Sequence, residues 1–232
     1  MKNLFFYTLL IGLFSIILNA QESERKQSLD AMMTSHGGKI FRNSKNKETK
    51  ILGTPYFQQM FASAKVDNVT QKYFMRYNVF EDEFEFITPK NDTLILDKIA
   101  DFNKITFTGT NKKYSLVEYT NSGGNYGKGY LIEFYTKGNY TLYIKEKVTY
   151  YSGKVAKTTL EKDMPERYVK ADNGYYFKNK ESGIFEFPES KKQLIKLYLD
   201  KKQEIETFIK ETKVSFSEDY DRIKIIDFLA TL

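Results

Sequence analysis

The densest group of side chains that could do acid–base or metal chemistry is acidic: Glu81, Asp82 and Glu83, with Glu85 two residues further on. Strand alternation places Glu83 and Glu85 on one face with Glu81 beside them, and hard cations such as Ca²⁺ bind where several oxygens share a small space. Glu81, Glu83 and Glu85 are therefore candidate metal ligands, and the four acids are the candidates for a carboxylate-based hydrolase. Their spacing is not that of an EF-hand loop, so an acidic hairpin tip is the favoured interpretation.

Other catalytic chemistry has little support in the sequence. The chain has no Cys and a single His, which excludes disulfides, thiolate metal sites and cysteine nucleophiles. His36 lies in the polar run 34–38 without an expected partner to fix its ring, so we interpret it as a solvated loop histidine. We predict that the protein is not an enzyme and needs no cofactor.

The glycine-rich run Ser122–Gly129 has the composition of a phosphate-binding loop but not its spacing. The Walker pattern requires Gly where Ser122 stands and Ser or Thr where Gly129 stands. Strands are expected on both sides, so no helix N-terminus is available to hold phosphate. We expect a long hairpin loop that exposes Tyr126 for contact.

Aromatic side chains are the largest surplus, with 19 Phe, 18 Tyr and no Trp. Tyrosine offers a large contact area with a polar tip, which suits protein or glycan binding. The alternative is ordinary sheet packing, because Tyr favours strands. The candidates for a binding surface on the wetter strand faces are Tyr119, Tyr126, Tyr135, Tyr143 and Tyr151.

Residues 1–20 have the pattern of a cleaved signal peptide, with a basic start, an apolar run and a small residue before Gln21. A membrane span needs about 20 apolar residues, so an uncleaved anchor is the less favoured alternative. No Cys follows the run, which excludes a bacterial lipid anchor. We expect an exported protein, periplasmic or secreted, with no transmembrane span after leader removal.

The polar residues 21–50 predict a flexible tether. The net charge of +6 comes from basic residues scattered among acids, so nucleic acid is not an expected partner. Asp92-Thr93-Leu94 matches a short O-glycosylation acceptor motif of Bacteroidota, which makes Thr93 a candidate modification site.

Residues 51–187 alternate apolar and polar side chains, which predicts about ten antiparallel strands in a β sandwich or open barrel. The longest run is 140–151, where Glu146 interrupts the apolar face. Gly138-Asn139 and Asn173-Gly174 predict two-residue hairpin turns.

The period becomes helical in residues 188–232. Ser190 and Gln193 have the spacing of a capping box, and three helices are expected. The fold class predicted is therefore α+β, with a β domain followed by a three-helix C-terminal segment.

Two stretches resemble exported hypothetical proteins of Flavobacteria and other Bacteroidota. One is Gly53-Thr54-Pro55-Tyr56 followed by the run from Arg76 to Phe86, and the other is Leu199-Asp200-Lys201-Lys202-Gln203-Glu204-Ile205 with its flanks. No catalytic residue comes with the resemblance. It implies by analogy a subunit of an outer-membrane machine.

These observations predict a non-catalytic periplasmic accessory protein that binds a larger cell-envelope complex. The alternative is a periplasmic carrier that holds a small hydrophobic or glycan ligand in a Phe/Tyr-lined β barrel.

Overall fold

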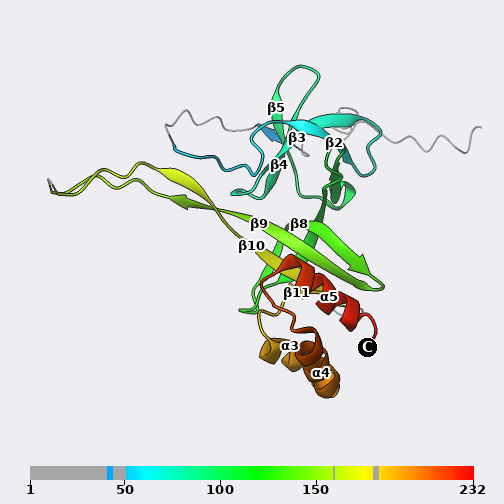
Figure 1. Ribbon diagram of the computed structural model, residues 1–232. Coiled ribbons are helices and arrows are strands. Elements are labelled where there is room, and N and C mark those ends of the chain that lie inside the picture. Colours follow the sequence, from blue (N-terminus) through cyan, green and yellow to red (C-terminus); the bar gives the residue numbers. More distant parts are fainter. Residues whose placement is uncertain (1–40, 44–50, 159, 180–182) are drawn as a thin grey trace, which may run out of the picture.

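The computed structural model describes residues 41–43, 51–158, 160–179 and 183–232 (Figure 1). The signal segment, His36 and most of the predicted tether lie outside these residues. Eleven strands form one mixed sheet and three α-helices follow it, which confirms the α+β class with a helical C-terminal segment. In the part of the chain described, no helix is both long and apolar enough to cross a membrane.

The elements follow the alternation of the sequence closely. The strands are β1 (Phe41–Asn43), β2 (Ala62–Val66), β3 (Lys72–Asn78), β4 (Glu83–Ile87), β5 (Thr93–Leu96), β6 (Lys104–Phe107), β7 (Lys113–Thr120), β8 (Tyr126–Lys137), β9 (Tyr140–Tyr151), β10 (Arg167–Lys178) and β11 (Ile184–Glu186). The helices are α3 (Lys191–Leu197), α4 (Lys202–Thr212) and α5 (Asp219–Leu229), with short 3₁₀ turns at Ala100–Phe102 and Leu199–Lys201.

The sheet runs in the order β1-β5-β4-β3-β2-β6-β7-β11-β10-β9-β8, and β7 also pairs with β8. The pairings of β7 to β11 therefore form a closed cycle. β11 pairs with β7 in parallel, so the prediction of a purely antiparallel sheet is wrong at this point. The cause is the long connection through β8, β9 and β10, which returns the chain to β7 in the same direction.

Two clusters of buried side chains lie on opposite faces of the strand cycle. One takes side chains from every strand of the cycle: Val117, Tyr119, Leu131, Tyr143, Tyr176 and Ile184. The larger cluster packs the faces of β2 to β6 against the other face of β7, β8 and β9. Alternation on β9 explains the division, because Tyr143 joins the first cluster and Ile144 the second.

The C-terminal helices cover the remaining part of this face. Leu142 and Phe177 of the sheet pack with Leu194, Ile205 and Ile226 of the helices. Phe208 and Phe228 stack with ring centroids 4.2 Å apart and so join α4 to α5. One half of the predicted capping box is confirmed, because Ser190 Oγ accepts a hydrogen bond from the Gln193 amide at 3.3 Å. The other half differs, because Gln193 Oε1 accepts from the Glu189 amide at 2.6 Å and not from that of Ser190.

Three local predictions differ from the structure. Gly138-Asn139 does form the turn between β8 and β9, but Asn173-Gly174 lies inside β10, where the register against β9 shifts between Ala171 and Gly174. The pair makes a β-bulge rather than a hairpin turn.

The other two differences concern strands that replace expected loops. Residues 41–43, expected in the tether, form β1 and pair with the outer edge of β5. β8 begins at Tyr126, so Gly127 and Gly129 belong to a strand and the hairpin loop is shorter than predicted. Their lack of a side chain makes room for the Tyr119 ring and for the Asp82 carboxylate.

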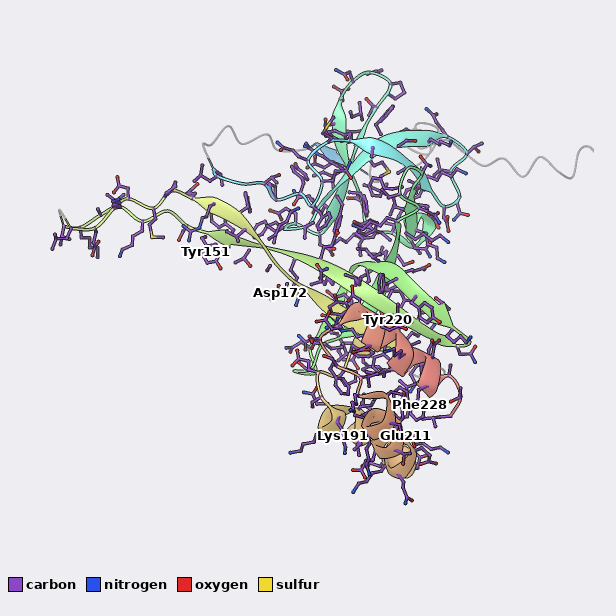
Figure 2. All side chains as sticks on the ribbon, in the orientation of Figure 1. Tyr151, Asp172, Lys191, Glu211, Tyr220 and Phe228 are labelled. Atoms are coloured by element: carbon purple, nitrogen blue, oxygen red, sulfur yellow. The ribbon has the colours of Figure 1, made fainter. Side chains whose placement is uncertain are left out.

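β9 and β10 extend beyond the body as a two-stranded ribbon, which we call the arm (residues 149–169) (Figure 1). Figure 2 shows Tyr151 along the arm and Asp172 where the ribbon joins the body. The base of the arm is held by Phe80, whose ring centroid lies 5.3 Å from that of Tyr168 and 6.1 Å from that of Tyr150.

Asp82, in the turn between β3 and β4, fastens this turn to β8 of the strand cycle. Its carboxylate accepts hydrogen bonds from the Tyr77 hydroxyl, from Lys98 Nζ at 2.7 Å and from the Tyr130 amide at 3.1 Å, and Lys145 Nζ lies 3.7 Å away. The carboxylate reaches the β8 backbone at Gly129, where an added Cβ would lie 2.3 Å from Asp82 Oδ2.

We predict that Gly129→Ala destabilises the protein by about 1–3 kcal/mol, because the new methyl group displaces the anchored Asp82 carboxylate. Gly109→Ala is the matched control, since nothing lies within 4 Å of a Cβ built there. Urea unfolding of both variants measures the effect. Equal unfolding midpoints for the two variants would contradict this account of the contact.

Candidate functional site

The site is built around a carboxylate on the apolar face of β9. The Glu146 side chain is only 3% exposed. Its Oε2 accepts a hydrogen bond from the Tyr114 hydroxyl at 2.8 Å, and its Oε1 accepts one from Lys112 Nζ at 2.5 Å. A carboxylate is buried at acceptable cost only when it is paired and hydrogen-bonded, and these two partners meet that requirement.

Two strand irregularities lie near the carboxylate, one on β10 opposite Glu146 and one on β8 opposite Leu142 and Tyr143. On β10, Asp172 and Asn173 together oppose the single residue Glu146, because the pairing passes from Ala171↔Lys147 to Gly174↔Lys145. On β8, Phe134 is the extra residue between the Glu133 and Tyr135 pairs. Bulges bend a strand and re-aim its side chains, and here Phe134 and Asn173 both turn toward the space above Glu146.

That space is a cavity of about 510 Å³, which we call the Glu146 cavity. Its lining is mostly apolar and aromatic, with a few polar groups. The lining residues are Phe57, Gln58, Met60, Arg76, Tyr77, Phe107, Thr110, Lys112, Tyr114, Ile132, Glu133, Phe134, Ile144, Glu146 and Asn173.

One wall of the cavity is the extended segment that precedes β2, which we call the strap (residues 51–61). At the arm, the Leu52 amide donates to the Glu166 carbonyl at 2.9 Å and the Leu52 carbonyl accepts from the Tyr168 amide at 2.8 Å. Gly53 has φ of +74°, and a Cβ there would lie 2.3 Å from the Tyr168 carbonyl oxygen, so this crossing requires glycine.

The strap continues over β3 toward the cavity. The Pro55 carbonyl accepts hydrogen bonds from the amides of Val79 and Phe80. Phe57 then reaches the cavity mouth, where the ammonium groups of Lys112 and Lys170 lie 4.3 Å and 4.2 Å from its ring centroid. The segment Gly53-Thr54-Pro55-Tyr56 and the run from Arg76 to Phe86, which form one pattern in the sequence, are therefore in contact at this wall.

A second ion pair supports the opposite side of the strap. Arg76 donates from Nε to Glu85 Oε2 at 2.8 Å, and its guanidinium lies 3.9 Å over the Tyr56 ring. The Tyr56 hydroxyl donates to Glu85 Oε1 at 2.9 Å. Arg76 also donates to the Gln59 carbonyl, so one side chain joins β4 to the strap.

Burial and the neighbouring carboxylates keep the phenols of this region neutral. Burial raises the pKa of Tyr114, and the charge of Glu146 raises it further. Burial, followed by the charge of Glu85, likewise raises the pKa of Tyr56. Both phenols therefore act as hydrogen-bond donors to carboxylates and not as bases.

Two of the four acids singled out from the sequence, Asp82 and Glu85, are held by partners within the chain. Glu85 is bound by Arg76 and Tyr56 as described, and Asp82 by its lysines and Tyr77. Glu81 is exposed and Glu83 half-buried. Within the described ranges, no three His, Cys, Asp or Glu side chains are grouped so that they could hold a metal ion.

The five tyrosines do not form one surface. Tyr143 is buried inside the strand cycle, so the expectation that it lies on a wet face is wrong. Tyr119 packs on Tyr176 with centroids 4.8 Å apart, and the Tyr135 hydroxyl donates to Asp227 Oδ1 at 2.6 Å. Tyr126 (88% exposed) and Tyr151 remain accessible, at separate places.

Two further residues complete the comparison with the sequence. Thr93 is half-buried at the start of β5, beside an exposed Asp92, and nothing in the structure bears on its modification. Glu146 is a site residue that the sequence does not single out as a candidate. The sequence does contain a sign of it, because a charged residue at an apolar position of an alternating run indicates a buried carboxylate, which must have partners.

We predict that Tyr114→Phe costs about 1–3 kcal/mol of unfolding free energy, because it removes one hydrogen bond from the buried Glu146 carboxylate. Tyr126→Phe is the matched control at an exposed position, where a change below about 0.5 kcal/mol is expected. Chemical denaturation of both variants gives the difference. If Tyr114→Phe matched its control, Glu146 would not depend on this bond.

Comparison with known proteins adds no assignment. No family model matches the chain, and no match was found among curated proteins or solved structures. The function must therefore be inferred from the geometry of the Glu146 cavity and of the arm.

Proposed function

We propose that the protein is an exported, non-catalytic binding protein that holds a small amphipathic molecule in the Glu146 cavity. The single observation that supports this is an aromatic-lined space of about 510 Å³ above a buried, fully partnered carboxylate. Ligand sites are typically clefts of roughly 300–1,000 Å³ with a mostly apolar lining and a few placed polar groups. Export rests on the leader at residues 1–20, which the described residues do not include.

The carboxylates at the site are held in fixed positions. Each one that lines or supports the cavity accepts a hydrogen bond within the chain: Glu146 from Tyr114, Glu133 from Ser115 and Glu85 from Arg76. Carboxylates fixed in this way can shape the cavity and orient a bound ligand.

The proposed ligand position differs from the interior of a barrel. We infer that the cycle of β7 to β11 is a small open barrel, and its inward cluster of Leu131, Tyr143 and Tyr176 supports this. Small barrels are filled by their own side chains. The carrier hypothesis therefore refers to the space outside the cycle, under the strap.

The binding proposal predicts that the neutral probe N-phenylnaphthylamine becomes fluorescent with the protein and that Phe57→Ala weakens its affinity by about fivefold, near 1 kcal/mol. Phe57 is 44% exposed and forms the cavity mouth. Phe74→Ala is the control, because Phe74 is 61% exposed and does not line the cavity. The proposal fails if the probe shows no saturable binding or if both variants lose affinity equally.

A second function, docking on a larger protein complex of the cell envelope, is favoured by the arm. Val155, Leu160 and Met164 are exposed near its tip, and Leu160 is 96% exposed. A two-stranded ribbon is only marginally stable by itself in water. Covering the exposed apolar side chains of such a ribbon with a protein partner would remove their surface from water and stabilise the ribbon.

The docking proposal is tested with a photo-crosslinking amino acid at Leu160 and, as control, at Lys90 in the exposed turn between β4 and β5. In native-host cells, the Leu160 position is expected to give one discrete cross-linked protein that the Lys90 position does not give. The same products from both positions, or none from Leu160, would refute docking through the arm.

A further inference from the structure

We propose that the ligand of the Glu146 cavity is an amphipathic anion: its acidic headgroup stays at the mouth beside Phe57, near Lys112 and Lys170, and its apolar body enters the cavity. This inference rests on the proposed binding function and adds the charge class of the ligand. A carboxylate, sulfate or phosphate ester on an aliphatic or aromatic body shares this chemistry.

The two lysines are arranged around one aromatic ring at the mouth. Lys112 Nζ and Lys170 Nζ lie 4.3 Å and 4.2 Å from the Phe57 ring centroid; Lys112 lines the cavity, whereas the exposed Lys170 does not. Lys170 Nζ also donates to the Phe57 carbonyl at 3.1 Å, which fixes its side chain across the strap. An anion entering beside Phe57 meets both positive charges.

The charge balance leaves Lys170 as the uncompensated cation. Glu146 pairs with Lys112, Glu85 with Arg76, and Glu133 lies 3.5 Å from Lys104 Nζ. Among the residues that the structure describes, no carboxylate lies within ion-pair distance of Lys170. The charged residues that line the cavity balance one another, Arg76 and Lys112 against Glu133 and Glu146, and Lys170 adds one positive charge beside Phe57.

A cationic ligand is disfavoured by the same contacts. Glu146 is the carboxylate most enclosed by the cavity, and both of its oxygens already accept hydrogen bonds. A cation at Glu146 would have to displace Lys112, and one at Glu133, the other carboxylate of the lining, would lie beside Lys104 Nζ, which is 3.5 Å from Glu133 Oε1. An anion adds a partner to Lys112 and Lys170 and displaces nothing.

The lining of the cavity allows the headgroup to stay at the mouth while the apolar body of the ligand is buried. Phe57 and Met60 form the rim, while Ile132, Ile144 and Phe107 line the deeper surface. Apolar groups placed there gain roughly 25 cal/mol for each Å² removed from water, and the headgroup stays at the exposed edge. This division is the one that an amphipathic anion requires.

The test is a displacement series against bound N-phenylnaphthylamine with decanoate, decanol and decylammonium, which share one chain length and differ in charge. Decanoate is expected to displace the probe at about fivefold lower concentration than decanol, and decylammonium only at higher concentration than either. Added salt should reduce the advantage of decanoate and leave decanol unchanged.

The matched variants are Lys170→Gln and Lys137→Gln, both exposed lysines; Lys137 is the last residue of β8 and does not line the cavity. Lys170→Gln should remove most of the preference for decanoate without changing probe affinity, and Lys137→Gln should keep it. Equal displacement by decanoate and decanol, or strongest displacement by decylammonium, overturns the charge assignment while the binding function stands. Failure of the neutral probe to bind overturns both.

Discussion

Burial of one negative charge, on Glu146, organises the centre of the molecule. Glu146 is on β9 and its partner Tyr114 is on β7, with β8 between them, so the two strands are separated by about 9–10 Å in a regular sheet. The long Tyr114 side chain crosses β8 to reach the carboxylate, and the turn before β7 brings Lys112 to its other oxygen. Tyr77, Phe84 and Tyr130 of the large cluster pack on the same face of the sheet, outside the strand cycle. The ion pair and the aromatic core are therefore parts of one arrangement.

The cavity follows from the same constraint. A charged pair cannot be covered by close-packed apolar side chains on every side, because the ammonium of Lys112 is most stable where water or a partner can reach it. The bulges at Phe134 and at Asp172–Asn173 instead bring Phe134 and Asn173 to the wall of the cavity. The strap then bridges the opening without filling it. Gly53 permits its close crossing of β10, and Phe57 is placed between two lysines.

The sequence predicted the elements better than their partners. The run 140–151, the turn at Gly138-Asn139 and the helices after Ser190 follow from local periodicity and were found as expected. The dipeptide Asn173-Gly174 is compatible with either a hairpin turn or a β-bulge. Only the pairing of the flanking residues with Lys145 and Lys147 shows that it forms a bulge. The parallel pairing of β11 with β7 joins three residues to a strand more than sixty positions earlier, which no local pattern reveals. The spacing of the acidic run 81–85 is visible in the sequence, but its basic partners are not. Arg76 pairs with Glu85, and Lys98 and Lys145 pair with Asp82.

The arm and the cavity are mechanically connected by the strap. Leu52 is hydrogen-bonded to the base of the arm at Glu166 and Tyr168, and five residues later Phe57 forms the cavity mouth. Lys170 adds a second link, because it belongs to β10 and donates to the Phe57 carbonyl. A displacement of the arm relative to the body must break these bonds or carry the strap with it, and either change alters the wall against which a ligand packs. Binding free energies at two sites are reciprocally coupled whenever each shifts the same element, so the proposed ligand binding and the proposed docking of the arm would be coupled through the strap.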